Sequence, residues 1–223
     1  MAISVIVSYD GTANDDDALA LGRMLSTGSL PISLAYVRHA REYDPAREEI
    51  AQHDAERRLE LGAVWLNDPA VGRHVVIDPS TGAGLARLAA EQDAALIVFG
   101  SDYRTSPGQV EPGGAAQHLF SGGTVAVAVA RAGLRTTGDG VIKTISVAPS
   151  ADDSAPEETA AALAEALGAT VSAGEDPGAD LIVVGSAPSA GPGRIALSGA
   201  TRTKLDSARS SVLVLARETP LAL

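Results

Sequence analysis

Apolar and polar residues follow one another along the chain in a pattern that predicts strands and helices in alternation. Short apolar, β-branched runs predict strands at residues 3–8, 31–37, 74–77, 96–100 and 125–130. Amphipathic spacing between them predicts helices from Asn14 or Asp15 onward and over residues 45–66, 85–92 and 115–120. This order predicts an α/β fold with a doubly wound, five-stranded parallel sheet and helices on both faces.

The second half of the chain repeats part of the first. Five residues recur at an offset of 85: Gly100, Ser101, Pro107, Gly108 and Gly114 return as Gly185, Ser186, Pro192, Gly193 and Gly199. Residues 125–131 resemble 211–217 at an offset of 86, and aligning Ile6 with Ile145 gives an offset of 139. The second copy is therefore expected to be about 54 residues shorter, lacking the long helix and the third strand.

The pattern of the second copy predicts strands near residues 145, 170–173, 181–185 and 212–215 and a helix over 156–167. We expect one domain at residues 1–132, a glycine- and threonine-rich linker at 133–140, and a shortened, degenerate domain at 141–223. The terminal strands of the two copies would each leave an open sheet edge.

Composition narrows the classes of partner. The net charge of −11 and the lack of a Lys/Arg cluster argue against nucleic acid as a partner. The absence of cysteine excludes disulfides, thiolate metal sites and cysteine nucleophiles. The sequence also shows no apolar run of about 18 residues, the length that a membrane span needs, and no signal-peptide pattern. A cytoplasmic protein without a membrane partner is expected.

No catalytic motif is found, so no catalytic residue is predicted. Asp15–Asp17 and the pair Asp152 and Asp153 could be read as metal ligands, but their positions favour turn and helix-start roles. The four histidines are scattered, which favours ordinary hydrogen bonding over a metal site; they are His39, His53, His74 and His118.

Two loops follow predicted strands in the way that ligand-binding loops of parallel sheets do. The first is Tyr9-Asp10-Gly11, and the second is the glycine-rich segment 101–114. A glycine-rich turn before a helix lets backbone N–H groups approach phosphate oxygens, and the Asp10 carboxylate is suited to a ribose or adenine. The same glycines are equally expected from turn geometry alone.

Residues 3–11, the strand segment Leu34-Ala35-Tyr36-Val37 and residues 96–131 together resemble a universal stress protein domain. ATP-binding members of that family carry Gly-x2-Gly-x9-Gly-Ser/Thr after the fourth strand, an Asp after the first strand and a Val on the second. Asp10 and Val37 match the Asp and the Val. Gly100 and Gly113 match the first and third glycines, whereas Tyr103 replaces the second glycine and Gly114 replaces the hydroxyl residue.

The resemblance implies a tandem universal stress protein with one adenine-nucleotide site in its first half. The implied residues are Tyr9, Asp10, Gly11, Val37, Gly100, Ser101, Arg104, Gly113, Gly114 and Ala115. The ligand would be ATP or another adenine nucleotide, with Mg²⁺ only as its companion. Arg104 is either a phosphate partner or a solvated surface residue. Pro149 falls where Asp10 would be in the second copy, so no complete site is expected there.

Two functions remain open. One is a regulatory stress protein that binds an adenine nucleotide, with at most slow ATP hydrolysis. The other is a protein-interaction module whose degenerate loop has lost ATP. Dimers of the family pair their last strands, which implies that residues 125–130 and 212–215 pair antiparallel as an internal pseudo-dimer. A homodimer of the whole chain is a further option, and the sequence identifies no protein partner.

Overall fold

The computed structural model describes residues 4–26, 30–137, 140–148, 152–172, 176 and 178–221. The first half contains β1 (Ser4–Ser8), α1 (Ala13–Leu25), β2 (Ile32–Arg38), α2 (Pro45–Leu66), β3 (Gly72–Ile77), α3 (Thr81–Gln92), β4 (Ala94–Gly100), α4 (Gly114–Leu119) and β5 (Ala126–Ala130). The second half contains a 3₁₀ turn, η1 (Leu134–Thr136), then β6 (Thr144–Ala148), α5 (Ala155–Leu167), β7 (Thr170–Val171), β8 (Leu181–Val184), α6 (Gly199–Ser207) and β9 (Ser211–Val214).

All strands of these ranges belong to one nine-stranded sheet in the order β3-β2-β1-β4-β5-β9-β8-β6-β7. Neighbouring strands are parallel except β5 and β9, which pair antiparallel with Val127 opposite Val214. The α/β class, the five-stranded parallel sheet of the first half and the antiparallel seam of the pseudo-dimer are therefore confirmed. The seam gives each half's terminal strand a partner, so neither leaves an open edge.

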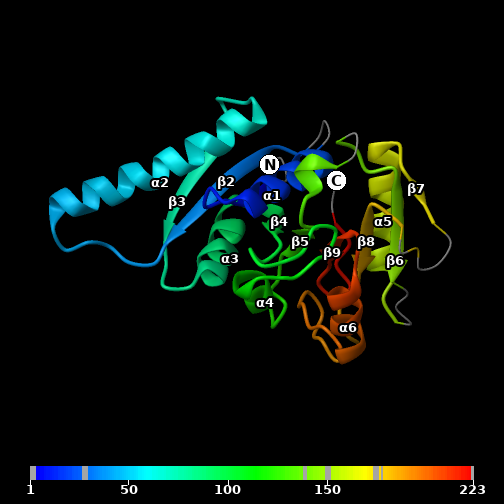
Figure 1. The fold of residues 1–223 in the computed structure, drawn as a ribbon. Helices are drawn as coiled ribbons and strands as arrows, with labels where there is room; N and C mark the ends of the chain where they lie inside the picture. The colour runs from blue at the N-terminus through cyan, green and yellow to red at the C-terminus, as the bar shows by residue number, and fades with distance from the viewer. Residues whose placement is uncertain are drawn as a thin grey trace.

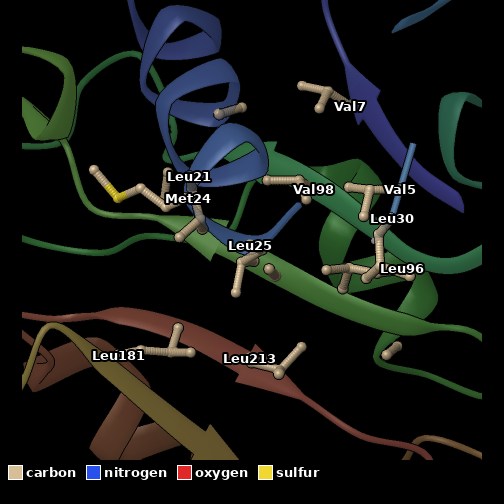
Figure 2. Close-up of a cluster of buried hydrophobic side chains, with 14 of the residues drawn as sticks. Val5, Val7, Leu21, Met24, Leu25, Leu30, Leu96, Val98, Leu181 and Leu213 are labelled. Carbon is tan, nitrogen blue, oxygen red and sulfur yellow. The ribbon is translucent and has the colours of Figure 1, made fainter. Parts of the chain in front are cut away.

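Helices cover both faces of the sheet. One face packs against α1, α2 and α5, and the other against α3, α4 and α6 (Figure 1). The first of these cores continues from one half into the other: Figure 2 shows Leu25 and Leu96 on the same side of the sheet as Leu213 and Leu181 of the second half. Burying aliphatic side chains across the seam joins the halves into one hydrophobic unit.

Most predicted elements lie within a few residues of their expected bounds, and α2 has the predicted ones. The start of α1 differs, because its N-cap is Thr12 rather than Asn14 or Asp15. Thr12 and Asp15 form a capping box, in which each side chain accepts from the other's backbone N–H. The helix α6 was not predicted. The repeat would have located it, since an offset of 85 places Gly199 on Gly114, where α4 begins.

The strand pairing corrects the offsets of the repeat. Leu96 lies opposite Ala126 and Leu181 opposite Ser211, so the terminal strands are also related by 85, not 86. Val5 pairs with Leu96 and Ile145 with Leu181, which relates the first strands by 140, not 139. The second copy is thus shorter by 140 − 85 = 55 residues.

The missing block also contains one more element than expected. Within the described residues between β7 and β8 there is no counterpart of α2, of β3 or of α3, and the loss of α3 was not foreseen. The described part of the second half therefore has no equivalent of the helix that packs Leu85 and Leu88 onto the sheet in the first half.

The segment expected to be a linker packs against α1 as far as it is described. The buried Asp17 carboxylate accepts hydrogen bonds from the backbone N–H groups of Gly133 and Arg135, both at 2.8 Å. Leu134 is buried with the α1 core. Residues 138 and 139 of the expected linker lie outside the described residues.

None of the helices in the described residues is both long enough and apolar enough to cross a membrane.

Candidate functional site

A cavity of about 130 Å³ opens where β1 and β2 end, at the carboxyl edge of the parallel sheet. Its lining comprises Ser8, Tyr9, Asp10, Asp15, Ala35, Tyr36, Val37, His39 and Thr81. The structure thus brings three predicted site residues, Tyr9, Asp10 and Val37, to one place. Gly11 follows directly at a φ of +91°, in the turn that leads to α1. Because β1 and β2 are parallel neighbours, residues just past their ends meet at the same edge.

Carboxylates dominate one wall of this cavity. Asp15 Oδ2 accepts hydrogen bonds from the Thr12 hydroxyl at 2.7 Å, the Thr12 backbone N–H at 2.9 Å and the Asp10 backbone N–H at 3.2 Å. Burial, followed by a hydrogen bond and charge repulsion from Asp10, raises the pKa of Asp15 to about 7. The Asp15 carboxyl group is therefore protonated in an appreciable fraction of molecules near neutral pH.

Tyr9 links this cavity to Asp16, which is not among the lining residues. The Tyr9 hydroxyl donates to Asp16 Oδ1 at 3.2 Å, and burial followed by the charge of Asp16 raises the pKa of the phenol, which stays protonated at neutral pH. Desolvation by burial also raises the pKa of Asp16. The wall therefore offers the carboxyl groups of Asp10 and Asp15, which suit the hydroxyl and amino groups of a ligand.

Arg58 is a residue of this region that the sequence did not reveal. Its guanidinium donates to the Asp10 backbone carbonyl at 2.6 Å and lies 5.5 Å from the centre of the Tyr36 ring. Arg58 belongs to α2, 48 residues after Asp10, on a helix whose pattern indicates only a solvated face. Predicting the contact between Arg58 and Asp10 would have required knowing how α2 lies relative to the ends of β1 and β2.

The loop after β4 is held against α1 rather than open toward the cavity. Asn14 Nδ2 donates to the carbonyl groups of Ser101 at 2.8 Å and Asp102 at 2.7 Å. A Cβ atom at Gly100 would lie only 2.1 Å from the Asn14 carbonyl oxygen, so only glycine permits this approach. The lack of a side chain at Gly100 therefore allows the end of β4 to pack closely against α1.

Ser101 also has a structural role. Its buried hydroxyl donates to the Ala130 carbonyl at 2.7 Å and accepts from the Glu111 backbone N–H at 3.2 Å. Ser186 repeats both contacts in the second half, donating to Leu215 at 2.7 Å and accepting from Ala196 at 3.3 Å. The serine of the repeated Gly-Ser pair thus has the same role in both halves. Its hydroxyl connects the end of the terminal strand to the loop that follows the preceding strand.

The remaining predicted residues lie along the same loop and not on the cavity. Tyr103 is 69% exposed, and the Arg104 guanidinium lies 4.9 Å from the centre of its ring. Gly113 is the N-cap of α4, and Gly114 and Ala115 form its first turn. The cavity lining includes none of Gly100, Ser101, Arg104, Gly113, Gly114 and Ala115. The ten predicted residues therefore form two groups, on the β1 and β4 sides of the α1 N-terminus.

Asp153 fulfils the predicted helix-start role in the second half. Its buried carboxylate accepts from the backbone N–H groups of Ala155 at 3.0 Å and Glu218 at 3.1 Å. The corrected offset of 140 relates Asp10 to position 150 rather than to Pro149, and both positions lie outside the described residues. In the part of the chain that is described, no three His, Asp or Glu residues form a group suited to a metal ion.

No protein-family model and no curated protein matches this chain. Solved structures do. A universal stress protein from Archaeoglobus fulgidus DSM 4304 matches with a TM-score of 0.59 at 14% identity, over 98% of this chain and 100% of its own. A functionally unknown protein from Pseudomonas aeruginosa PAO1 matches with a TM-score of 0.60 at 14% identity, over 97% of this chain and 94% of its own.

The matches extend over both halves, in agreement with the internal repeat and with the seam between β5 and β9. At 14% identity, these matches are evidence for the fold alone. The chain therefore has the fold of the universal stress proteins.

Proposed function

We propose that the chain is a universal stress protein-like regulatory protein that binds an adenine nucleotide in the cavity at the ends of β1 and β2. The observation that carries this proposal is the convergence of Tyr9, Asp10 and Val37 on one cavity at the carboxyl edge of a parallel sheet. In this proposal the Asp10 carboxylate accepts hydrogen bonds from the ribose, and Val37 contacts the base. A role in a stress response and a cytoplasmic location belong to the same proposal.

Size and charge favour the nucleoside end of the ligand over a triphosphate. The cavity of about 130 Å³ is smaller than the roughly 300–1,000 Å³ typical of ligand sites. Asp10 and Asp15 bring carboxyl groups to its wall, and these repel phosphate oxygens. We expect AMP or adenosine to bind more tightly than ATP, and ATP to bind only as its Mg²⁺ complex.

Isothermal titration of adenosine, AMP and Mg-ATP into the wild type and Asp10→Ala tests the proposal. The variant should bind adenosine about tenfold more weakly, because a charge-assisted hydrogen bond is lost. Asp54→Ala is the matched control, since Asp54 is exposed on α2 and does not line the cavity. Equal adenosine affinity in the wild type and Asp10→Ala would place the ligand elsewhere. Mass spectrometry of ligand released from never-dialysed protein would identify the natural occupant.

Turnover of nucleotide is expected to be negligible. Phosphoryl transfer depends on positioned cations and an oriented nucleophile, and the groups that line the cavity are mainly hydroxyls and carboxyls. Phosphate release at about 1 per second or faster, an ordinary enzymatic rate, would contradict this part of the proposal.

A second candidate function has its own observation. Asn14 binds two carbonyl groups of the β4 loop, so the loop that holds phosphates in the family is closed against α1. This contact favours a protein-interaction module that has lost ATP. If none of adenosine, AMP and Mg-ATP gives a saturable heat of binding, the interaction module is the better description.

A further inference from the structure

In the second half, no helix among the described residues covers the part of the sheet face that α3 covers in the first half. In the first half, Leu85 and Leu88 of α3 pack over Ile97, which is fully buried. Ile182 is the equivalent of Ile97 at the offset of 85, and it is only partly buried. The counterpart of α3 is absent from the described residues, and Ala148 on the neighbouring β6 is also partly exposed.

A cavity of about 150 Å³ occupies this face, between the sheet and α6. Its floor is apolar: Ala148, Ile182, Val184, Leu205 and Val212 line it. An apolar cavity of this size is known to accommodate a benzene-sized group. The floor therefore suits a small hydrocarbon group.

The rim of this cavity is polar at positions that are apolar in the first half. Ala116 and Leu119 of α4 are buried apolar residues, and their equivalents on α6 are Thr201 and Lys204, both of which line the cavity. Polar residues here would suit a face that is merely solvated. Three of the five floor residues, Val184, Leu205 and Val212, belong to the buried core. Ala148 and Ile182 pack against that core and remain partly exposed at the cavity.

Charged side chains lie at the rim. Among the described residues that line the cavity, Arg209 and Lys204 are basic and Asp176 is acidic. Asp176 Oδ1 already accepts from the Gly178 backbone N–H at 2.8 Å. Arg209 is exposed, and its side chain makes no hydrogen bond or ion pair with any described residue. In a chain of net charge −11, the Arg209 guanidinium at this cavity is a local positive charge that attracts an anion.

We propose that this cavity binds a small apolar carboxylate, with its hydrocarbon group on the floor and its carboxylate group beside Arg209. The site belongs to the second half and is separate from the cavity at β1 and β2. It does not depend on nucleotide binding there.

The test uses the full chain and three probes: benzoate, benzylamine and acetate. Benzoate should produce saturable shifts in the methyl NMR signals of Ile182 and Val212. Benzylamine has the ring with the opposite charge and acetate has the charge without the ring, so both should bind at least about tenfold more weakly. Equal shifts from benzoate and benzylamine, or no saturation by millimolar benzoate, would overturn the proposal.

Two variants locate the site. Arg209→Gln should weaken benzoate binding about tenfold, while Arg202→Gln, an exposed arginine on α6 that does not line the cavity, should leave it unchanged. Ala148→Phe should abolish binding by filling the cavity, with circular dichroism used to verify the fold. Benzoate affinity that is unchanged in Arg209→Gln, or shifts that map to Val37 instead, would also refute the assignment.

Discussion

The carboxylate of Asp17 and the guanidinium of Arg135 form an ion pair at 2.9 Å between α1 and the segment that follows β5. Asp17 is fully buried, and the same carboxylate accepts the backbone N–H groups of Gly133 and Arg135. Asp17→Ala should therefore lower the free energy of unfolding by about 3 kcal/mol, because it leaves buried donors and a cation unpaired. Urea denaturation measures this, and Asp54→Ala on exposed α2 should change stability by less than about 0.5 kcal/mol.

The seam between the halves predicts that they unfold together. Leu213 is fully buried and lies opposite Ala128 across the antiparallel pair. Leu213→Ala should cost about 2–5 kcal/mol and should lower hydrogen-exchange protection in both halves. Leu61→Ala, at a side chain that is 55% exposed, is the control. Loss of protection confined to the second half would show that the halves are not coupled through β5 and β9.

Two glycines of the β4 loop should respond oppositely to alanine. At Gly100 a Cβ atom would meet the Asn14 carbonyl oxygen at 2.1 Å, so Gly100→Ala should destabilise by about 3 kcal/mol through overpacking. A Cβ atom added at Gly114, the first residue of α4, would meet no other part of the protein within 4 Å. Gly114→Ala should be neutral or stabilise by up to about 1 kcal/mol. Thermal unfolding of the two variants compares them, and equal melting temperatures would contradict the close approach.

The raised pKa of Asp15 predicts a pH dependence of stability. Burial and Asp10 raise the pKa of Asp15 from 3.8 to about 7, so the folded state holds a proton that the unfolded state releases. Stability should therefore fall as the pH rises from about 4 to about 7 and should then level off. Asp15→Asn removes this titration. Urea denaturation across that range should show a shallower decline for Asp15→Asn than for the wild type, whereas Asp54→Asn should match the wild type.

Glu218 predicts a gain in stability. Glu218 has a φ of +56° and is the equivalent of Gly133, which has a φ of +84°, at the offset of 85. The left-handed conformation costs an L-residue about 1–2 kcal/mol, so Glu218→Gly should raise the free energy of unfolding by up to about 1 kcal/mol. The backbone N–H of residue 218 keeps its hydrogen bond to Asp153 in the variant. A lower melting temperature would show that the Glu218 side chain contributes more than its backbone costs.

The sequence was informative wherever a local pattern decides the structure. Hydrophobic patterns identified β1, β4 and α2. A strand buried on both faces has a continuous apolar run, whereas a helix buried along one stripe has apolar residues about every three or four positions. The convergence of Asp10 and Val37 followed from parallel topology. These inferences needed no knowledge of distant contacts.

What the sequence could not reveal depends on such contacts. The closure of the β4 loop by Asn14 was missed, because a glycine at position 100 is compatible with both an open and a closed loop. The alignment of the terminal strands was wrong by one residue because an offset of 86 matches Arg131 with Arg217. The alternating Val and Ala residues before Arg131 do not distinguish this offset from 85. A slip of one residue moves every side chain to the other face, and only the pairing of Leu181 with Ser211 corrects it.

The pairing of β5 with β9 inside one chain also frees the two halves from each other in evolution. In a symmetric dimer of identical chains, every substitution enters both sides of the assembly at once. Here Leu119 and Lys204 occupy equivalent positions but differ in charge and hydrophobicity, and α3 of the first half has no counterpart among the described residues of the second. Covalent connection lets one half conserve its scaffold while the other changes its surface.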